Sequence, residues 1–150
     1  GASVAPRTLH DLGAALYVHM TPEVVWALAA LTMTTVIAQG MLYQGFALAC
    51  HVHCPAMLEA STYSLLFAAV LFLPALVADP AARAGERYGH EGVALAAGAA
   101  LMVAAAAFAG STAGASLAAL TLACGGLNVA CVVAVNALLA PALGEPERPL

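Results

Sequence analysis

One short segment of this chain brings together residue types that bind metal ions. Cys50, His51, His53 and Cys54 fall within five residues, and Met57 follows closely. Thiol and imidazole ligands together suit soft or borderline metals such as Cu(I) and Zn(II). On a continuing helix Cys50 and Cys54 would share one face, because residues four apart lie on the same side. The segment therefore predicts a copper or zinc site made by Cys50, His51, His53 and Cys54, and no other cofactor is predicted.

Two other interpretations of this segment stay open at this point. Cys50 and Cys54 could form a disulfide, provided that they lie on an oxidising side of a membrane. Alternatively, both are free thiols packed at a helix end, and His51 and His53 are simply polar groups at a membrane interface. Measuring the copper and zinc content of the protein before and after replacing both cysteines distinguishes metal binding from the other two interpretations.

The rest of the sequence offers no recognisable catalytic site. It contains no glycine-rich phosphate loop and no nucleophile elbow. Cys124 and Cys131 are seven residues apart on one helix face, too far for a mutual disulfide, so we expect both to be buried as small apolar side chains. No Asp, Glu, Lys or Arg falls within a long apolar segment, whereas ion-coupled pumps and proton relays usually carry one there. We therefore predict that this chain is not an enzyme.

The elements that position these residues must lie in a membrane, because the chain has too few charges to cover a soluble core. Of its 150 residues, 63% are hydrophobic and 8% are charged, whereas a soluble domain carries roughly 25% charged residues. Lysine is absent, and the four scattered arginines form no patch that could follow a phosphate backbone. The composition thus predicts an integral membrane protein and argues against nucleic acid as a partner.

Charged residues divide the chain into four apolar segments that could each cross a hydrocarbon core as a helix. The expected fold is an all-α, integral membrane bundle of four transmembrane helices. These spans are predicted over 24–49, 61–78, 93–109 and 117–140. They make up a transmembrane domain over 23–140, which a polar or interfacial segment (1–22) precedes and a tail (141–150) follows.

The arginines indicate which side of the membrane each end faces. Arg7 precedes the first span, Arg83 and Arg87 lie in a predicted loop over 79–92, and Arg148 follows the fourth span. With four spans, all three of these segments share one face, and positive charge favours the cytoplasmic side. We therefore expect both termini on the cytoplasmic (or matrix) side of a bacterial inner membrane or an organellar inner membrane, in a multi-pass protein.

Small residues are expected to bring the helices together. Apolar burial contributes little between helices in lipid, so close backbone approach and interhelical hydrogen bonds must replace it. The third span carries Ala96, Ala100 and Ala104 at four-residue spacing, and the fourth carries Gly126 at the start of a similar ridge. Both ridges predict close helix packing.

Polar side chains within the spans are expected to avoid lipid. Asn128 and Asn136 in the fourth span should face protein or a cavity, because an amide facing hydrocarbon is costly. Gln39 and Gln44 in the first span carry the same cost. One interpretation is that these side chains form interhelical hydrogen bonds; the other is that they line a polar pathway or a ligand site.

A further set of residues resembles a known family of transporters. These residues are Asp79, Arg83, Gly85 and Arg87 in the segment between the second and third spans, Phe108 to Ser111, and the pair Gly125-Gly126. From about Thr21 onward the chain is similar to the first four helices of a major facilitator superfamily transporter. The resemblance implies solute transport in a twelve-helix protein, of which four helices would be the leading third. Alternating access would require the remaining helices as a counterpart.

These observations lead to three hypotheses about function. The first is a non-enzymatic small subunit that packs within a larger membrane complex, for example a respiratory or other bioenergetic assembly. Its partners would be the lipid bilayer, with bound lipid, and other membrane protein subunits. The second is a transporter, or a transporter fragment, of the major facilitator type. The third is an extracytoplasmic membrane protein that handles copper or zinc through Cys50, His51, His53 and Cys54.

Overall fold

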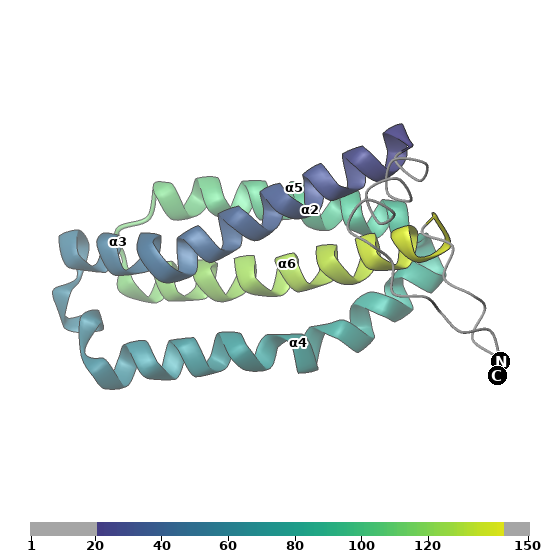
Figure 1. Cartoon of the computed structure of the whole chain (residues 1–150). Helices are drawn as coiled ribbons and strands as arrows, with labels where there is room; N and C mark the ends of the chain where they lie inside the picture. Colours follow the sequence, from purple (N-terminus) through teal and green to yellow (C-terminus); the bar gives the residue numbers. More distant parts are fainter. Residues whose placement is uncertain (1–20, 143–150) are drawn as a thin grey trace, which may run out of the picture.

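Four long helices run side by side through the part of the chain that the computed structural model describes, residues 21–142 (Figure 1). No strand occurs among these residues. In chain order the elements are α2 (Pro22–Gly40), η1 (Met41–Gly45), α3 (Phe46–His53), η2 (Pro55–Leu58), α4 (Ala60–Tyr88), α5 (His90–Ala109) and α6 (Gly114–Ala142). Four of the described helices, α2, α4, α5 and α6, are long and apolar enough to cross a membrane. The all-helical fold class predicted from the sequence is confirmed.

The predicted first span, 24–49, lies within one unbroken helix that changes pitch in its middle. Thr21 Oγ1 accepts a hydrogen bond from the backbone N–H of Val24 and caps the start of α2, where Pro22 suits a first-turn position. The π-helical turn η1 then joins α2 to α3, with the N–H of Phe46 donating to the carbonyl of Met41. The helix ends only at His53, beyond the predicted end of the span.

The predicted loop over 79–92 is wrong, because α4 continues as a helix to Tyr88. Charged residues mark the end of an apolar segment, but they do not by themselves end a helix, and α4 continues even through Pro80. Asp79 and Arg83 are four residues apart on this extension, and their charged groups lie 3.8 Å apart in solvent. Gly89 alone separates α4 from α5, with a φ of 91° that side-chain-bearing residues rarely adopt.

The two ends of the bundle carry different parts of the chain. The α3–α4 connection and the α5–α6 connection lie at one end, on the left of Figure 1, and the start of α2, the α4–α5 turn and the end of α6 lie at the other. Residues 21 and 142 are therefore at the same end as Arg83 and Arg87. Arg7, Arg148 and the terminal segments 1–20 and 143–150 fall outside the described residues. The side of the membrane that this end faces stays a prediction.

The core consists of three small apolar clusters spaced along the bundle. One lies at the α3–α4 end around Phe46 and Leu117, a second in the middle around Leu101 and Cys124, and a third at the opposite end around Val135. Most other apolar side chains point outward, which is expected when lipid surrounds the helices.

Candidate functional site

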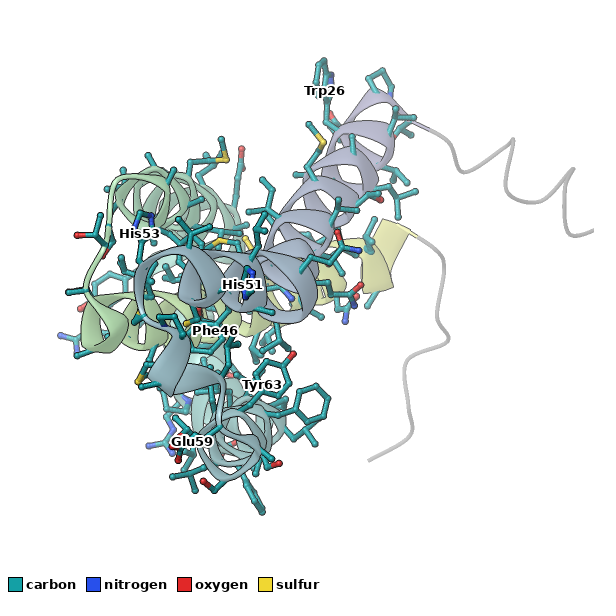
Figure 2. The ribbon with its side chains drawn as sticks, turned by 90° about the vertical axis from the view of Figure 1, so that its left-hand side faces the viewer. Trp26, Phe46, His51, His53, Glu59 and Tyr63 are labelled. Atoms are coloured by element: carbon teal, nitrogen blue, oxygen red, sulfur yellow. The ribbon has the colours of Figure 1, made fainter. Side chains whose placement is uncertain are left out.

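The Cys50 side chain lies inside the bundle, where α3 meets α4 and α6. It is fully buried in a cluster with Phe46, Leu66 and Leu117. The Phe46 ring faces the Tyr63 ring of α4, with 6.2 Å between the ring centroids, and Figure 2 shows this pair behind the end of α3. Cys50 is thus positioned by the packing of α3 on two neighbouring helices.

The chain turns sharply after Cys50, and this turn brings two more sulfur-bearing residues to the same place. Cys54 ends α3 with its N–H donating to the Cys50 carbonyl over 2.8 Å, and its carbonyl accepts from the Met57 N–H over 3.0 Å. The Cys54 group lies close enough to Cys50 to affect its acidity, and both residues are free cysteines. Cys54 and Met57 are partly buried against the same apolar cluster.

Gly114, the first residue of α6, provides the space for these sulfurs. A Cβ atom at Gly114 would lie 3.3 Å from Cys54 Sγ and 3.3 Å from Met57 Sδ. The two sulfur atoms therefore lie within twice that distance of each other. They also face the amino-terminal end of a helix, whose unpaired N–H groups carry partial positive charge and stabilise thiolates.

The two histidines of the predicted metal site lie elsewhere. His51 and His53 are both exposed on the last turn of α3, at the surface of the bundle end shown in Figure 2. Cys50 faces the interior, so the structure does not gather the predicted set of Cys50, His51, His53 and Cys54. Among the described residues, no group of three or more His, Cys, Asp or Glu side chains is placed to hold a metal ion.

Burial affects the acidity of Cys50, which lies just beyond the predicted first span. Desolvation of the thiolate, together with the neighbouring Cys54, raises the pKa of the Cys50 thiol to about 11. Without a bound cation, Cys50 is therefore a neutral thiol near pH 7, and its thiolate forms only when something compensates the charge.

The fourth span packs largely as its pattern predicts. Asn128 is partly buried and accepts a hydrogen bond from Thr35 Oγ1 of α2 over 3.4 Å. A Cβ at Gly126 would lie 3.8 Å from Val77 of α4, so this glycine lies at a close contact between α4 and α6. Cys124 and Cys131 are buried, as expected, and Cys131 Sγ donates to the Ala94 carbonyl of α5 over 3.4 Å.

Three other amides face outward instead of forming the expected interhelical hydrogen bonds. Gln39, Gln44 and Asn136 are all exposed. Gln39 and Gln44 lie next to each other at the π-helical turn, where they line a shallow hollow of about 280 Å³ together with Val36 and Gly40. Neither glutamine has a hydrogen-bond partner within residues 21–142.

The alanine ridge of the third span also faces away from the interior for most of its length. Ala96 and Ala100 are exposed, and only Ala104 is partly buried. The buried face of α5 is formed by Ala97 and Leu101 instead. Because α5 is apolar around its whole circumference, its small residues alone do not determine which face turns inward.

A second hollow opens near the end of the bundle where α2 begins. It is a groove of about 900 Å³ between α2, α5 and α6, lined by small residues that include Ala27, Ala94 and Gly98. Glu23 and Glu91, each in the first turn of its helix, also line it. In Figure 2, α2 leans out from the other helices on this side, with Trp26 near its outer tip. The groove offers space for the lipid that the sequence predicts as a bound partner.

The two described arginines lie on the polar extension of α4. Arg83 pairs with Asp79, and the Arg87 guanidinium lies 5.3 Å from the centre of the Tyr88 ring. Both arginines are exposed. Neither points into a cavity, which agrees with a role at a membrane surface.

Sequence reasoning noticed Met57 but missed its partnership with Gly114. These residues are far apart in the chain and meet only because α6 begins beside the α3–α4 turn. No periodic sequence pattern predicts a contact between such distant residues. The one local indication of a turn here was Pro55, which starts the 3₁₀ turn that carries Met57.

Residues 21–142 form an all-helical fold with four helices able to cross a membrane, which indicates a multi-pass membrane protein. Comparisons with protein-family models, with curated proteins and with solved structures found no match.

Proposed function

We propose that this protein is a non-enzymatic subunit of a larger membrane complex, and that the face of Gln39 and Gln44 contacts a transmembrane helix of a partner. The observation that carries the proposal is the exposure of both amides, without partners among the described residues, at a π-helical turn in the first span. π-Helical turns are frequent at functional positions of helices.

The physical argument concerns the cost of an amide in hydrocarbon. Moving an amide from water to an alkane without a hydrogen bond costs on the order of 4–8 kcal/mol. Gln39 and Gln44 lie near the middle of the helix that runs from Pro22 to His53, away from both of its ends. A polar side chain on a neighbouring transmembrane helix would remove much of this cost.

The shape of this face suits a helix. Nothing lies within 4 Å of a Cβ at Gly40, so a second backbone can approach the chain between the two glutamines. The outward-facing Ala96 and Ala100 of α5 offer a second surface of small residues. We therefore infer a partner helix that carries at least one side chain with both donor and acceptor groups.

The test removes the two amides together. The variant Gln39→Leu/Gln44→Leu keeps the surface apolar, and Met33→Leu, an exposed change on the same helix, is the matched control. In mild detergent, native sizing should show the wild type and the control in a large heteromeric complex and the double variant as an isolated helical chain. A wild type that runs as a monomer or homodimer, or a double variant that stays in the complex, would overturn the proposal.

Transport remains the main alternative to this proposal. A transporter resembling the major facilitator superfamily predicts that the reading frame continues beyond Leu150 with further helices. If that continuation were found, this chain would be interpreted as the leading part of a larger transporter instead of as a separate subunit. In that case the Gln39 and Gln44 face would meet a later helix of the same chain.

A further inference from the structure

We propose that Cys50, Cys54 and Met57 form a binding site for one Cu(I) ion at the α3–α4 end of the bundle, with Gly114 providing the space. This site differs from the one predicted by the sequence, because it uses sulfur ligands only and leaves out His51 and His53. It is independent of the proposed subunit function.

The geometry supports three converging sulfur ligands. Cys54 packs against the cluster that contains Cys50, and Cys54 Sγ and Met57 Sδ lie equally close to a single point beside Gly114. All three side chains pack in the same apolar cluster. The backbone hydrogen bonds from Cys54 to Cys50 and from Met57 to Cys54 fix the turn that brings them together.

The donor set selects the metal. Thiolate and thioether ligands are soft and favour Cu(I), whereas imidazole and carboxylate ligands suit Zn(II) and harder ions. A structural zinc site needs four ligands, and the described residues supply no histidine or carboxylate to this cluster. A three-coordinate Cu(I) ion matches the number and the kind of ligands present.

Binding is a simple exchange of protons for metal. Cu(I) forms one bond to each thiolate, the two thiol protons pass to solvent, and Met57 donates a lone pair without losing a proton. The resulting site carries one negative charge, which the amino-terminal end of α6 stabilises. Cys54 and Met57 are partly exposed, so the ion can enter from the end of the bundle where His51 and His53 lie.

The site is tested by Cu(I) binding to the full chain in detergent, under anaerobic reducing conditions and against a chromogenic copper chelator. We expect about one Cu(I) per chain. Cys50→Ser and Cys54→Ser should each prevent the protein from taking Cu(I) from the chelator. Met57→Leu should lower the Cu(I) affinity by roughly tenfold or more. Cys131→Ser and His51→Ala/His53→Ala are the controls and should bind as the wild type does.

A second measurement does not depend on the folding of variants. X-ray absorption of the wild-type copper complex should show sulfur neighbours and no nitrogen neighbour around the metal. A nitrogen neighbour, loss of binding in His51→Ala/His53→Ala, or full binding by Cys50→Ser or Cys54→Ser would overturn the proposal. Preferential binding of Zn(II) by the wild type would overturn it as well.

Discussion

Thr35 and Asn128 join the first and last long helices of the described chain through a hydrogen bond between their side chains. The Thr35 hydroxyl donates to Asn128 Oδ1 over 3.4 Å, and both residues are partly buried. The contact lies where α2 packs on α6, with apolar residues on either side. It favours one register of α2 on α6, because the two side chains meet only in that register.

Removing this hydrogen bond should destabilise the bundle modestly. Interhelical hydrogen bonds in membranes contribute about 0.6 kcal/mol on average and up to about 1.7 kcal/mol. We expect Thr35→Val and Asn128→Leu each to lower the free energy of unfolding by an amount in this range, and the double variant to lose less than the sum. Unfolding in a denaturing detergent, followed by circular dichroism, measures these changes. If the loss of unfolding free energy in the double variant equalled the sum of the two single losses, the two side chains would not interact.

The contrast between Asn128 and Asn136 shows what the sequence can predict in a membrane protein. An amide within an apolar segment needs a hydrogen-bond partner, and this argument places Asn128 correctly against α2. It does not place Asn136 or Gln39, which are exposed. Each amide in an apolar segment requires a hydrogen-bond partner, but the sequence does not say whether that partner belongs to the same helix bundle.

The boundaries of the fold show a similar limit. Hydropathy locates four spans because lipid demands long apolar helices, and all four helices are present. It cannot locate the end of α4, since charged residues from Asp79 to Arg87 interrupt the apolar pattern while the chain stays helical to Tyr88. The contact of Met57 with Gly114 is a tertiary contact, so it depends on how α3, α4 and α6 pack.

The two cysteines at the end of α3 should differ sharply in reactivity. Cys54 is partly exposed, whereas Cys50 is fully buried and has its pKa raised to about 11. Only the thiolate reacts with a maleimide. A pKa of about 11 leaves on the order of one Cys50 thiol in ten thousand ionised at pH 7. In metal-free protein, Cys54 should therefore be alkylated first.

The pH dependence of Cys50 alkylation follows from the direction of that shift. Because the pKa is raised, the thiolate fraction and the alkylation rate should both rise about tenfold per pH unit up to about pH 11. Mass spectrometry of peptides labelled with a water-soluble maleimide between pH 7 and 10 measures both sites. Equal labelling of Cys50 and Cys54 at pH 7 would contradict the burial of Cys50.

Two adjacent glycines of α6 should differ in their response to the same substitution. A Cβ at Gly125 would lie 2.9 Å from Leu73 Cδ1 of α4, closer than real side chains approach, whereas a Cβ at Gly126 would lie 3.8 Å from Val77. Gly125→Ala therefore requires the Leu73 side chain to move, and the terminal methyl of a partly exposed leucine can do so at small cost by a change of rotamer, so this variant should be less stable than Gly126→Ala without displacing α4. Gly126→Ala should be neutral or stabilising, because alanine favours the helix by up to about 1 kcal/mol.

The same unfolding assay separates these two variants, and each serves as the control for the other. Cysteine cross-linking between α4 and α6 adds an independent distance measurement, which should stay unchanged in both variants. If Gly126→Ala were the more damaging variant, the register of α4 on α6 would differ from the one described here.

Gly89 offers the sharpest test of the turn between α4 and α5. Its φ of 91° lies in a region that residues with a side chain rarely adopt, so Gly89→Ala should cost about 1–3 kcal/mol through backbone strain. Gly92, three residues later in α5, has open space around its missing Cβ and an ordinary helical backbone, so Gly92→Ala should stabilise by up to about 1 kcal/mol. Thermal unfolding in detergent compares the two variants directly. If Gly89→Ala matched Gly92→Ala, α4 and α5 would have to run into each other as one continuous helix, and the hairpin that places Arg83 and Arg87 at the same end of the bundle as the start of α2 would be wrong.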